Sequence, residues 1–249
     1  MGAASAGLVR ERGVQVDLVA GSDVVGWYSA LFAARSISLP DGLYILSKYA
    51  QLYDEFVKSG LYAGLWVFAK HNRVKEFFLQ ESGKELSLAQ IYPEKFAVVG
   101  PVDAIAKLEL FLKQEAISYE PYDLGLGLHA PLAESLVAPL HDYLEKIDIK
   151  TPEIPVISPL SGKEITTDVQ LKEIAKTIFT QPVLVDKIID RLRGADELLV
   201  AIPAQKIRAS LEKLFEHKKL VTMETAAEFA LISPAADTAL KKEDDGQQS

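Results

Sequence analysis

The residues best placed for chemistry lie in a short turn between an expected strand and an expected helix. A nucleophile elbow has the pattern G-x-S-x-G at such a turn, because small residues let the backbones of helix and strand approach closely. In the segment from Asp17 to Ala34 this pattern, counted back from Gly26, has Val24 at the nucleophile position. Valine has no nucleophilic atom, and the hydroxyl of Ser22 comes two positions earlier. The segment is therefore built like an elbow without its nucleophile.

A second candidate is His129, which lies in a glycine-rich loop just before Pro131. Histidine is the natural general base at neutral pH, so it can take a proton from a hydroxyl group. Taken alone, a histidine in a loop is more often structural or on the surface than catalytic, so the residue by itself leaves both interpretations open. The remaining histidines fall on expected loops or polar helix faces and are predicted to be solvated: His71, His141 and His217.

Composition excludes several other kinds of site. The chain of 249 residues has no cysteine, which removes disulfides, thiolate nucleophiles and thiolate zinc sites. Its histidines and carboxylates show no metal-ligand spacing. The sequence contains no G-x-x-x-x-G-K-S/T phosphate loop, and no G-x-G-x-x-G pattern follows an expected strand. The sequence therefore predicts no metal and no cofactor.

Charge and hydropathy argue against nucleic acid or an anionic membrane as the main partner. The formal net charge is −8 and the isoelectric point is about 5.1. No apolar run approaches the roughly 20 residues that span a bilayer. Met1–Gly7 lacks the basic start and the long apolar stretch of a signal peptide. Together with the absence of cysteine, these features predict a cytoplasmic protein.

The turn and the loop need regular elements to hold them. Val14–Ala20 has the composition of a short buried strand, and Tyr28–Ala34 that of a buried helix. Ser38 can cap a following long amphipathic helix, with Pro40 in its first turn. Three tyrosines of that helix are predicted to pack under the next segment rather than bind a ligand: Tyr44, Tyr49 and Tyr53.

Residues 61–123 have a pattern of their own. Strand-like stretches are expected at 63–69, 85–92, 95–100 and 117–122, and helical stretches at 73–81 and 102–115. The resulting order, βαββαβ, is typical of a ferredoxin-like subdomain. The segment is therefore predicted to be a compact insertion in a larger fold.

The rest of the chain favours an α/β core around this insertion. Helices are expected at about 129–147, 168–180, 183–192 and 205–215, and extended segments at 151–158, 197–202 and 221–224. The prediction is a hydrolase-like, parallel-sheet α/β core formed by residues 1–60 and 124–232. The subdomain occupies residues 61–123, and residues 233–249 form a disordered tail.

Six segments, in order, resemble malonyl-CoA:acyl carrier protein transacylases and the acyltransferase domains of polyketide synthases. The resemblance as a whole covers about Val9 to Glu224. The six segments correspond to the elbow strand and helix, the subdomain turn, the loop of the base, and three later motifs. The segments are Asp17-Leu-Val-Ala-Gly21 with Gly26 and Tyr28-Ser-Ala-Leu31, Val98-Val-Gly-Pro-Val102, His129-Ala-Pro-Leu132, Ile154-Pro-Val-Ile-Ser158 with Leu160-Ser-Gly162, Gln181-Pro-Val183, and Pro203 to Leu211. The resemblance implies the same fold, including the inserted subdomain.

The resemblance also implies which positions correspond to the family's site. At these positions the family's serine is replaced by Val24, the preceding histidine by Asp23, the glutamate after the elbow by Trp27, the malonyl-binding arginine by Tyr49, and the pocket Asn and Gln by Ile91 and Lys95. Only the base, at His129, matches. The family's opening strand and its G-Q-G oxyanion loop have no counterpart, so the chain is expected to be N-terminally short.

Two functional hypotheses follow. In the first, the chain is a degenerate, catalytically impaired transacylase homologue that acts as a binding or assembly module in fatty-acid or polyketide synthesis. Its partner would be an acyl carrier protein, a synthase subunit or another copy of the chain, and a partner strand could complete the sheet. In the second, it is an active S-malonyltransferase or acyl-CoA hydrolase that uses Ser22 or Asp23 with His129. A truncated or decaying gene product is the plain alternative to both.

Overall fold

The computed structural model describes residues 9, 11, 13–124, 128–200, 215 and 219–222. Four sequence predictions lie outside these residues: the state of the tail at 233–249, most of the helix at 205–215, the motif from Pro203 to Leu211, and the surroundings of His217. Among the described residues, no helix is both long and apolar enough to cross a membrane.

The core contains a three-stranded sheet of very short strands. In this sheet β1 (Val19–Ala20) pairs in parallel with β6 (Val156–Ile157), and β6 pairs with β7 (Glu164–Ile165). The strand expected at Val14–Ala20 pairs only at its last two residues. Pro155 and Pro159 flank β6, and because proline has no N–H to donate, they limit the length of this ladder.

The core is a mixed sheet rather than the parallel sheet predicted. Strand β7 runs antiparallel to β6 because a tight turn joins them, in which the N–H of Ser158 donates to the carbonyl of Lys163. Gly162 has a φ of 71°, a left-handed conformation that glycine adopts without strain. A separate parallel pair is formed by β9 (Glu197–Val200) and β10 (Lys219–Thr222).

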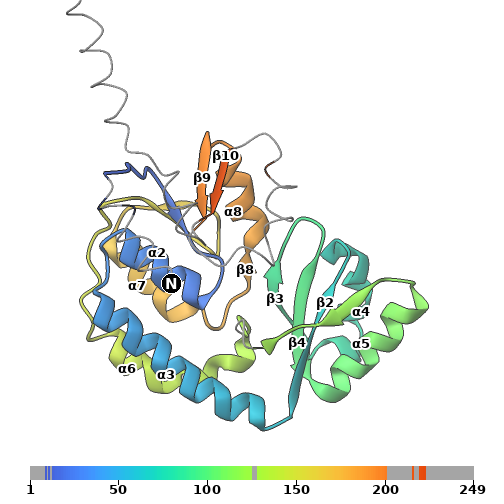
Figure 1. The fold of residues 1–249 in the computed structure, drawn as a ribbon. Helices are drawn as coiled ribbons and strands as arrows, with labels where there is room; N and C mark the ends of the chain where they lie inside the picture. The colour runs from blue at the N-terminus through green and yellow to red at the C-terminus, as the bar shows by residue number, and fades with distance from the viewer. Residues whose placement is uncertain are drawn as a thin grey trace, which may run out of the picture.

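Figure 1 labels the helices of the core. They are α2 (Val24–Ala33), α3 (Leu39–Lys58), α6 (Glu134–Leu144), α7 (Asp168–Thr177) and α8 (Val185–Leu192), with a 3₁₀ turn, η4 (Pro131–Ala133), leading into α6. Helix α3 begins as predicted, since the Ser38 side chain accepts a hydrogen bond from the backbone N–H of Asp41. Helix α2 packs on α3, α3 on α6, and α6 on α7.

Residues 62–121 form a group of elements around a second sheet. In chain order they are β2 (Tyr62–Val67), η1 (His71–Val74), α4 (Lys75–Leu79), η2 (Glu81–Gly83), β3 (Ser87–Ile91), β4 (Phe96–Pro101), α5 (Val102–Gln114) and β5 (Tyr119–Pro121). The strands are antiparallel in the order β5-β2-β4-β3. The single helix expected at 73–81 is broken into α4 and two 3₁₀ turns.

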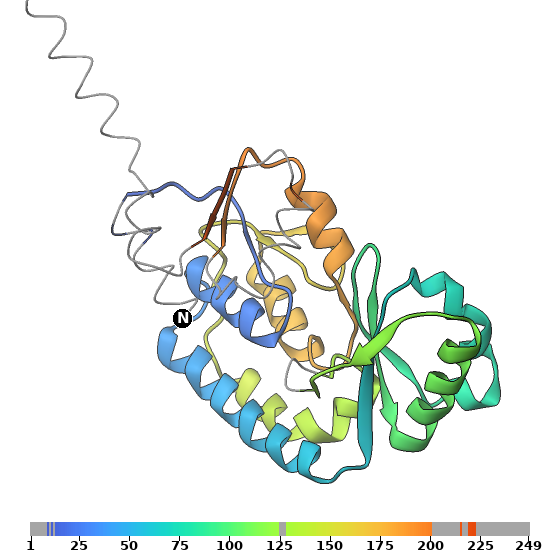
Figure 2. The same cartoon turned by 45° about the vertical axis from the view of Figure 1, so that its right-hand side comes forward.

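Residues 62–121 share a sheet and part of the main hydrophobic core with the rest of the molecule. Strand β8 (Val183–Leu184), which comes from the core, adds in parallel to the edge at β3 (Figure 2), where a helix start had been predicted. Strand β4 is buried on both faces. Its alternate residues Ala97 and Val99 belong to the main core, whereas Phe96 and Val98 belong to the core beneath α5. Residues of this sheet therefore share the main core with the helices that carry the candidate site.

Candidate functional site

The turn between β1 and α2 brings two glycines into backbone contact. A Cβ atom added at Gly21 would lie 2.1 Å from the carbonyl carbon of Gly26 and 2.5 Å from the backbone nitrogen of Trp27. The glycines that permit this close approach are thus Gly21 and Gly26, with four residues between them, whereas G-x-S-x-G has three. The turn is one residue longer than the elbow predicted from the sequence.

Asp23 begins the helix that follows. Its backbone is extended, with φ −151° and ψ −175°, and its Oδ1 accepts a hydrogen bond of 2.6 Å from the N–H of Gly26. None of the residues from 21 to 26 has a positive φ, so the strained conformation of a nucleophile elbow is absent here. The carboxylate of Asp23 occupies the place at the helix N-terminus where an oxyanion or a substrate anion would be stabilised.

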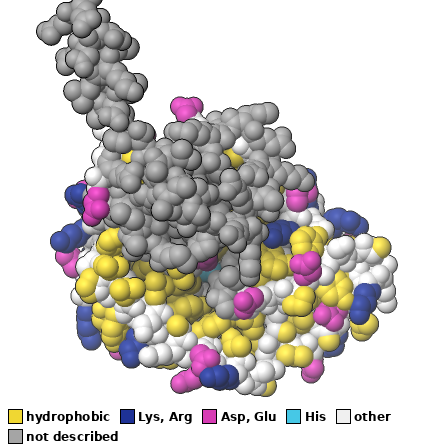
Figure 3. Space-filling view, viewed as in Figure 1, with side chains coloured by type: hydrophobic (Ala, Val, Ile, Leu, Met, Phe, Trp, Pro, Cys, Tyr) yellow, Lys and Arg dark blue, Asp and Glu magenta, His cyan; other side chains and the backbone are white. Residues whose placement is uncertain are grey.

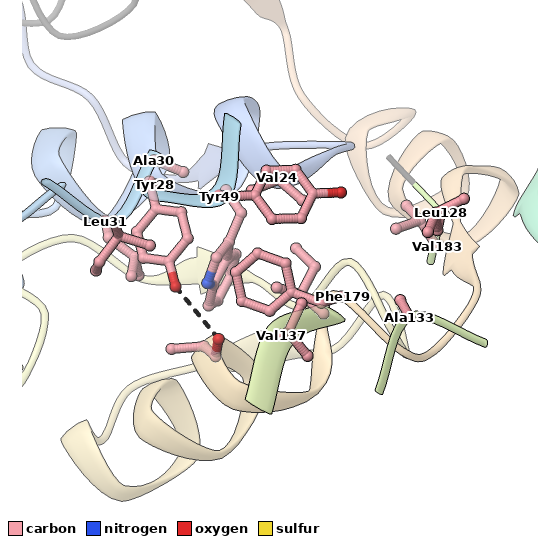
Figure 4. Close-up of a cluster of buried hydrophobic side chains, with 14 of the residues drawn as sticks. Val24, Tyr28, Ala30, Leu31, Tyr49, Leu128, Ala133, Val137, Phe179 and Val183 are labelled. Atoms are coloured by element: carbon pink, nitrogen blue, oxygen red, sulfur yellow. Dashed lines mark hydrogen bonds between the residues drawn. The ribbon is translucent and has the colours of Figure 1, made fainter. Parts of the chain in front are cut away.

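Val24 is the first residue of α2 and is 2% exposed. It belongs to the main hydrophobic core together with Tyr49 and Phe179 (Figure 4). Ser22 is half-buried and precedes the capping residue, at the end of the turn nearest β1. The structure therefore places an aliphatic side chain at the position where the resemblance predicts the serine.

His129 is fully buried in the loop before η4, with a left-handed φ of 44°. Its Nδ1 lies 2.7 Å from the carbonyl oxygen of Ile178. Since a carbonyl only accepts hydrogen bonds, Nδ1 carries the proton in this contact and Nε2 is the basic nitrogen of the neutral ring. A fixed tautomer of this kind is what a general base requires.

Tyr49 occupies the expected arginine position, on the buried face of α3. Its ring lies 5.5 Å from that of Tyr53 and 5.0 Å from that of Phe179, measured between centroids. Burial raises the pKa of both tyrosines well above the ordinary value, and nearby carboxylates, Asp23 for Tyr49 and Asp123 for Tyr53, add to the shift. Both hydroxyls are therefore neutral at physiological pH, and neither can replace the charge of a guanidinium group.

Lys95 lies in the turn between β3 and β4 and points to aromatic rings. Its Nζ is 4.2 Å from the ring centroid of Trp66 and 5.1 Å from that of Tyr92, which is cation–π geometry. Burial lowers the pKa of Lys95, and the charge of Glu120 opposes this shift. Ile91, the other replaced pocket position, is the last residue of β3.

A cavity of about 370 Å³ opens beside the turn. Helix α3 supplies most of its wall, including Tyr49 and Tyr53, and the start of α2 supplies Asp23 and Val24. Asp123, from the segment after β5, completes it. Val24, Asp23 and Tyr49, which the resemblance assigned to one site, therefore do meet at one cavity, whereas Lys95 does not line it.

Two features of the site were not predicted. The capping by Asp23 had a local signal in the sequence, because an aspartate directly precedes a helical stretch. Asp123 had no signal, because only the tertiary fold brings it to α3. One histidine prediction was wrong: His141 is half-buried on α6, with its Nε2 enclosed, because α6 packs against both α3 and α7. His71 is exposed, as expected.

Comparison with known proteins identifies relatives by sequence and by fold. No family model matches the chain. The chain is 31% identical over 163 residues to the non-reducing polyketide synthase tpeB of Talaromyces stipitatus, covering 66% of this chain and 7% of the synthase. It is 24% identical over 221 residues to the malonyl CoA-acyl carrier protein transacylase of Bacillus subtilis, covering 86% of this chain and 69% of the transacylase.

Solved structures show the same fold. The malonyl-CoA:acyl carrier protein transacylase FabD of Xanthomonas oryzae pv. oryzae superposes with a TM-score of 0.83 at 20% identity, covering 92% of this chain and 75% of the other. The molecule is thus an α/β protein of the transacylase fold. By sequence the chain is a homologue of malonyl CoA-acyl carrier protein transacylase and of non-reducing polyketide synthases. It spans only about 7% of the polyketide synthases that it matches.

Proposed function

We propose that this chain is a catalytically impaired member of its family that acts as a binding or assembly module in fatty-acid or polyketide synthesis. The observation that carries the proposal is the buried Val24 at the head of α2, where the resemblance places the serine. The nucleophile accounts for a rate factor of about 10⁶ in a serine enzyme. A valine supplies none of it.

The surroundings of Val24 support the same conclusion. The carboxylate of Asp23 holds the N–H of Gly26, so this donor is not available to an oxyanion. Tyr49 offers a neutral ring where a malonyl carboxylate would need a cation. Nucleophile, anion stabilisation and carboxylate binding are independent requirements, and in this proposal the same cavity lacks all three.

The framework that surrounds the site is the part we propose to be functional. We propose that residues 61–123 form a ferredoxin-like subdomain, supported by the strand order β5-β2-β4-β3 with helices between β2 and β3 and between β4 and β5. The transacylase relatives are named for their action on acyl carrier protein. We therefore propose an acyl carrier protein or a synthase subunit as the partner, and self-association as a further possibility to test.

The experiment is a transfer assay with radiolabelled malonyl-CoA and acyl carrier protein. The protein should transfer no label above the rate without protein, while binding the carrier protein in a titration followed by light scattering or fluorescence. The variant Val24→Ser should remain inactive, because the longer turn and the Asp23 cap persist. If the unaltered protein transfers label at rates typical of enzymes, the proposal that catalysis is impaired is refuted. If the protein is a monomer that binds no carrier protein, the proposal that it acts as a binding or assembly module is refuted.

His129 favours a second candidate, an active S-malonyltransferase or acyl-CoA hydrolase in which Ser22 or Asp23 acts with this base. The contact with Ile178 leaves Nε2 as the basic nitrogen, as a general base needs. If this candidate is correct, measurable turnover should be lost in Ser22→Ala or Asp23→Asn and in His129→Gln. Turnover that survives all three substitutions would exclude the mechanism.

A further inference from the structure

A stripe of apolar side chains on α3 lines the cavity beside the turn. Its members are Leu46, Ala50, Tyr53 and Val57. Their spacing of four, three and four residues places them on one side of the helix. A stripe of this kind usually packs against another element, yet Ala50 is exposed and Val57 is 43% exposed. The described elements therefore leave part of the stripe uncovered.

Helix α2 adds aliphatic side chains to the same cavity. Val24 and Val25, its first two residues, both line the cavity, and Val25 is 61% exposed. The volume of about 370 Å³ is within the range of small-molecule sites, whose walls are mostly apolar. An apolar molecule in this space would remove the exposed aliphatic surface of both helices from water, which is favourable.

The wall offers little to an anionic ligand. Its described lining residues include no lysine, arginine or histidine. The carboxylate of Asp23 accepts the N–H of Gly26, and that of Asp54 pairs with Lys58. A carboxylate that entered beside these aliphatic side chains would lose its water without gaining a cation, and this desolvation is costly. The apolar wall therefore favours a ligand without charge.

One polar group in the wall is an independent sign of a ligand. Tyr53 is only 7% exposed, and its buried hydroxyl has no hydrogen-bond partner among the described residues. Such a hydroxyl destabilises the protein unless another group completes its hydrogen bonding. A phenol can donate one hydrogen bond and accept others, so a neutral amide, hydroxyl or carbonyl group would satisfy it.

We propose that this cavity binds an uncharged aliphatic molecule that carries one neutral hydrogen-bonding group. The chain lies along the α3 stripe and against Val24 and Val25, and the polar group reaches the hydroxyl of Tyr53. The inference rests on the proposed function and deepens it, because it gives the binding module a class of ligand.

The test compares three probes. Hexanamide and hexanoate share a chain and nearly a shape but differ in charge, and propanamide has the same head group with three methylenes fewer. By calorimetry or ligand-observed NMR, hexanamide should bind saturably and at least ~10-fold more tightly than hexanoate. Propanamide should bind at least ~10-fold more weakly than hexanamide, because each buried methylene contributes up to ~4-fold. Absent hexanamide binding, equal or tighter hexanoate binding, or equal binding of the two amides would overturn the proposal.

Variants locate the binding to this cavity. Ala50→Trp fills it from an exposed helix position and should weaken hexanamide binding at least ~10-fold. Ala106→Trp is the matched control, since Ala106 is exposed on α5 and does not line the cavity, and it should leave binding unchanged. Equal effects of these two variants would overturn the location.

Tyr53→Phe tests the polar contact. The variant keeps the ring and removes a hydroxyl without a described partner, so the free protein should fold normally. Hexanamide binding should weaken ~3- to 10-fold, and unchanged binding would overturn the role of the hydroxyl. Malonyl transfer is measured separately. Absent hexanamide binding would thus count against this inference alone, whereas label transfer would count against the proposed function.

Discussion

Replacing Gly21 by alanine places a methyl group where the backbone of α2 already lies. The added Cβ would be 2.1 Å from both the carbonyl carbon and the carbonyl oxygen of Gly26, and contacts of Cβ atoms below 3.0 Å essentially do not occur. Because the obstacle is backbone, a rotamer change cannot relieve the clash. The helix has to move away from β1, and its buried side chains, among them Trp27 and Leu31, lose packing.

The expected cost is at the upper end of overpacking effects, about 3 kcal/mol. For a chain of this size that corresponds to a fall in melting temperature of about 6–12 °C. Differential scanning calorimetry or urea unfolding measures it directly.

Gly42→Ala is the matched control. Gly42 lies in α3, and an added Cβ would have no neighbour within 4 Å. Alanine is the better helix former there, so this variant should gain about 0.5–1 kcal/mol. If Gly21→Ala changes stability by less than about 0.5 kcal/mol, the contact between turn and helix described above is wrong.

Three further outcomes are expected. Asp23→Ala should lower the free energy of unfolding by about 1 kcal/mol through loss of the cap, whereas Asp23→Asn should cost little, and denaturant titrations that find the two equal would contradict the capping role. Tyr28→Phe removes the buried bond from the hydroxyl to the carbonyl of Ala175, 3.2 Å long, and should cost about 1 kcal/mol; an unchanged unfolding midpoint would count against that bond. Burial and the nearby Asp23 raise the pKa of Tyr92 to about 12. The folded protein therefore keeps this proton between pH 10 and 12 while the unfolded chain releases it. Stability present below pH 10 is lost as the pH rises through 12, with a slope of about 1.4 kcal/mol per pH unit for each such tyrosine. Tyr92→Phe should make the decline shallower in unfolding experiments at alkaline pH, and an identical slope would refute the assignment.

Elements with local signals were predictable from the sequence. Helix α3 is predicted by Ser38, by Pro40 and by a regular apolar face, and all of these lie within the helix or its cap. The tyrosines of α3 show the limit of such patterns. Tyr49 and Tyr53 are one turn apart and are both buried. Tyr44, five residues before Tyr49, lies on a different face of the helix. Its side chain is 43% exposed, and its ring contacts that of Tyr143.

Elements that depend on distant partners were not predictable. Strand β1 is short because the prolines around β6 limit its ladder, and β8 exists because β3 offers an unpaired edge. The candidate site likewise has features that the sequence predicts and features that depend on distant partners. The resemblance brought Val24 and Tyr49 together, and they do line one cavity, but the extra residue in the turn and the approach of Asp123 appear only in three dimensions.

The described residues on one face of the molecule show how its charges are distributed. On the face seen in Figure 3, basic side chains stand singly or in small groups between acidic and apolar ones. This pattern agrees with the acidic net charge of −8.

The pairing of β1 with β6 has a consequence for the order of folding. Val19 meets Val156 only after the whole segment between them has become compact, whereas the partners that pair among β2, β3 and β4 are much closer to each other in the chain. Closing a long loop costs entropy that short loops avoid. We therefore expect residues 62–121 to form first and the core sheet to close last. The cavity, which needs both α2 and Asp123, would then be among the final parts of the molecule to appear.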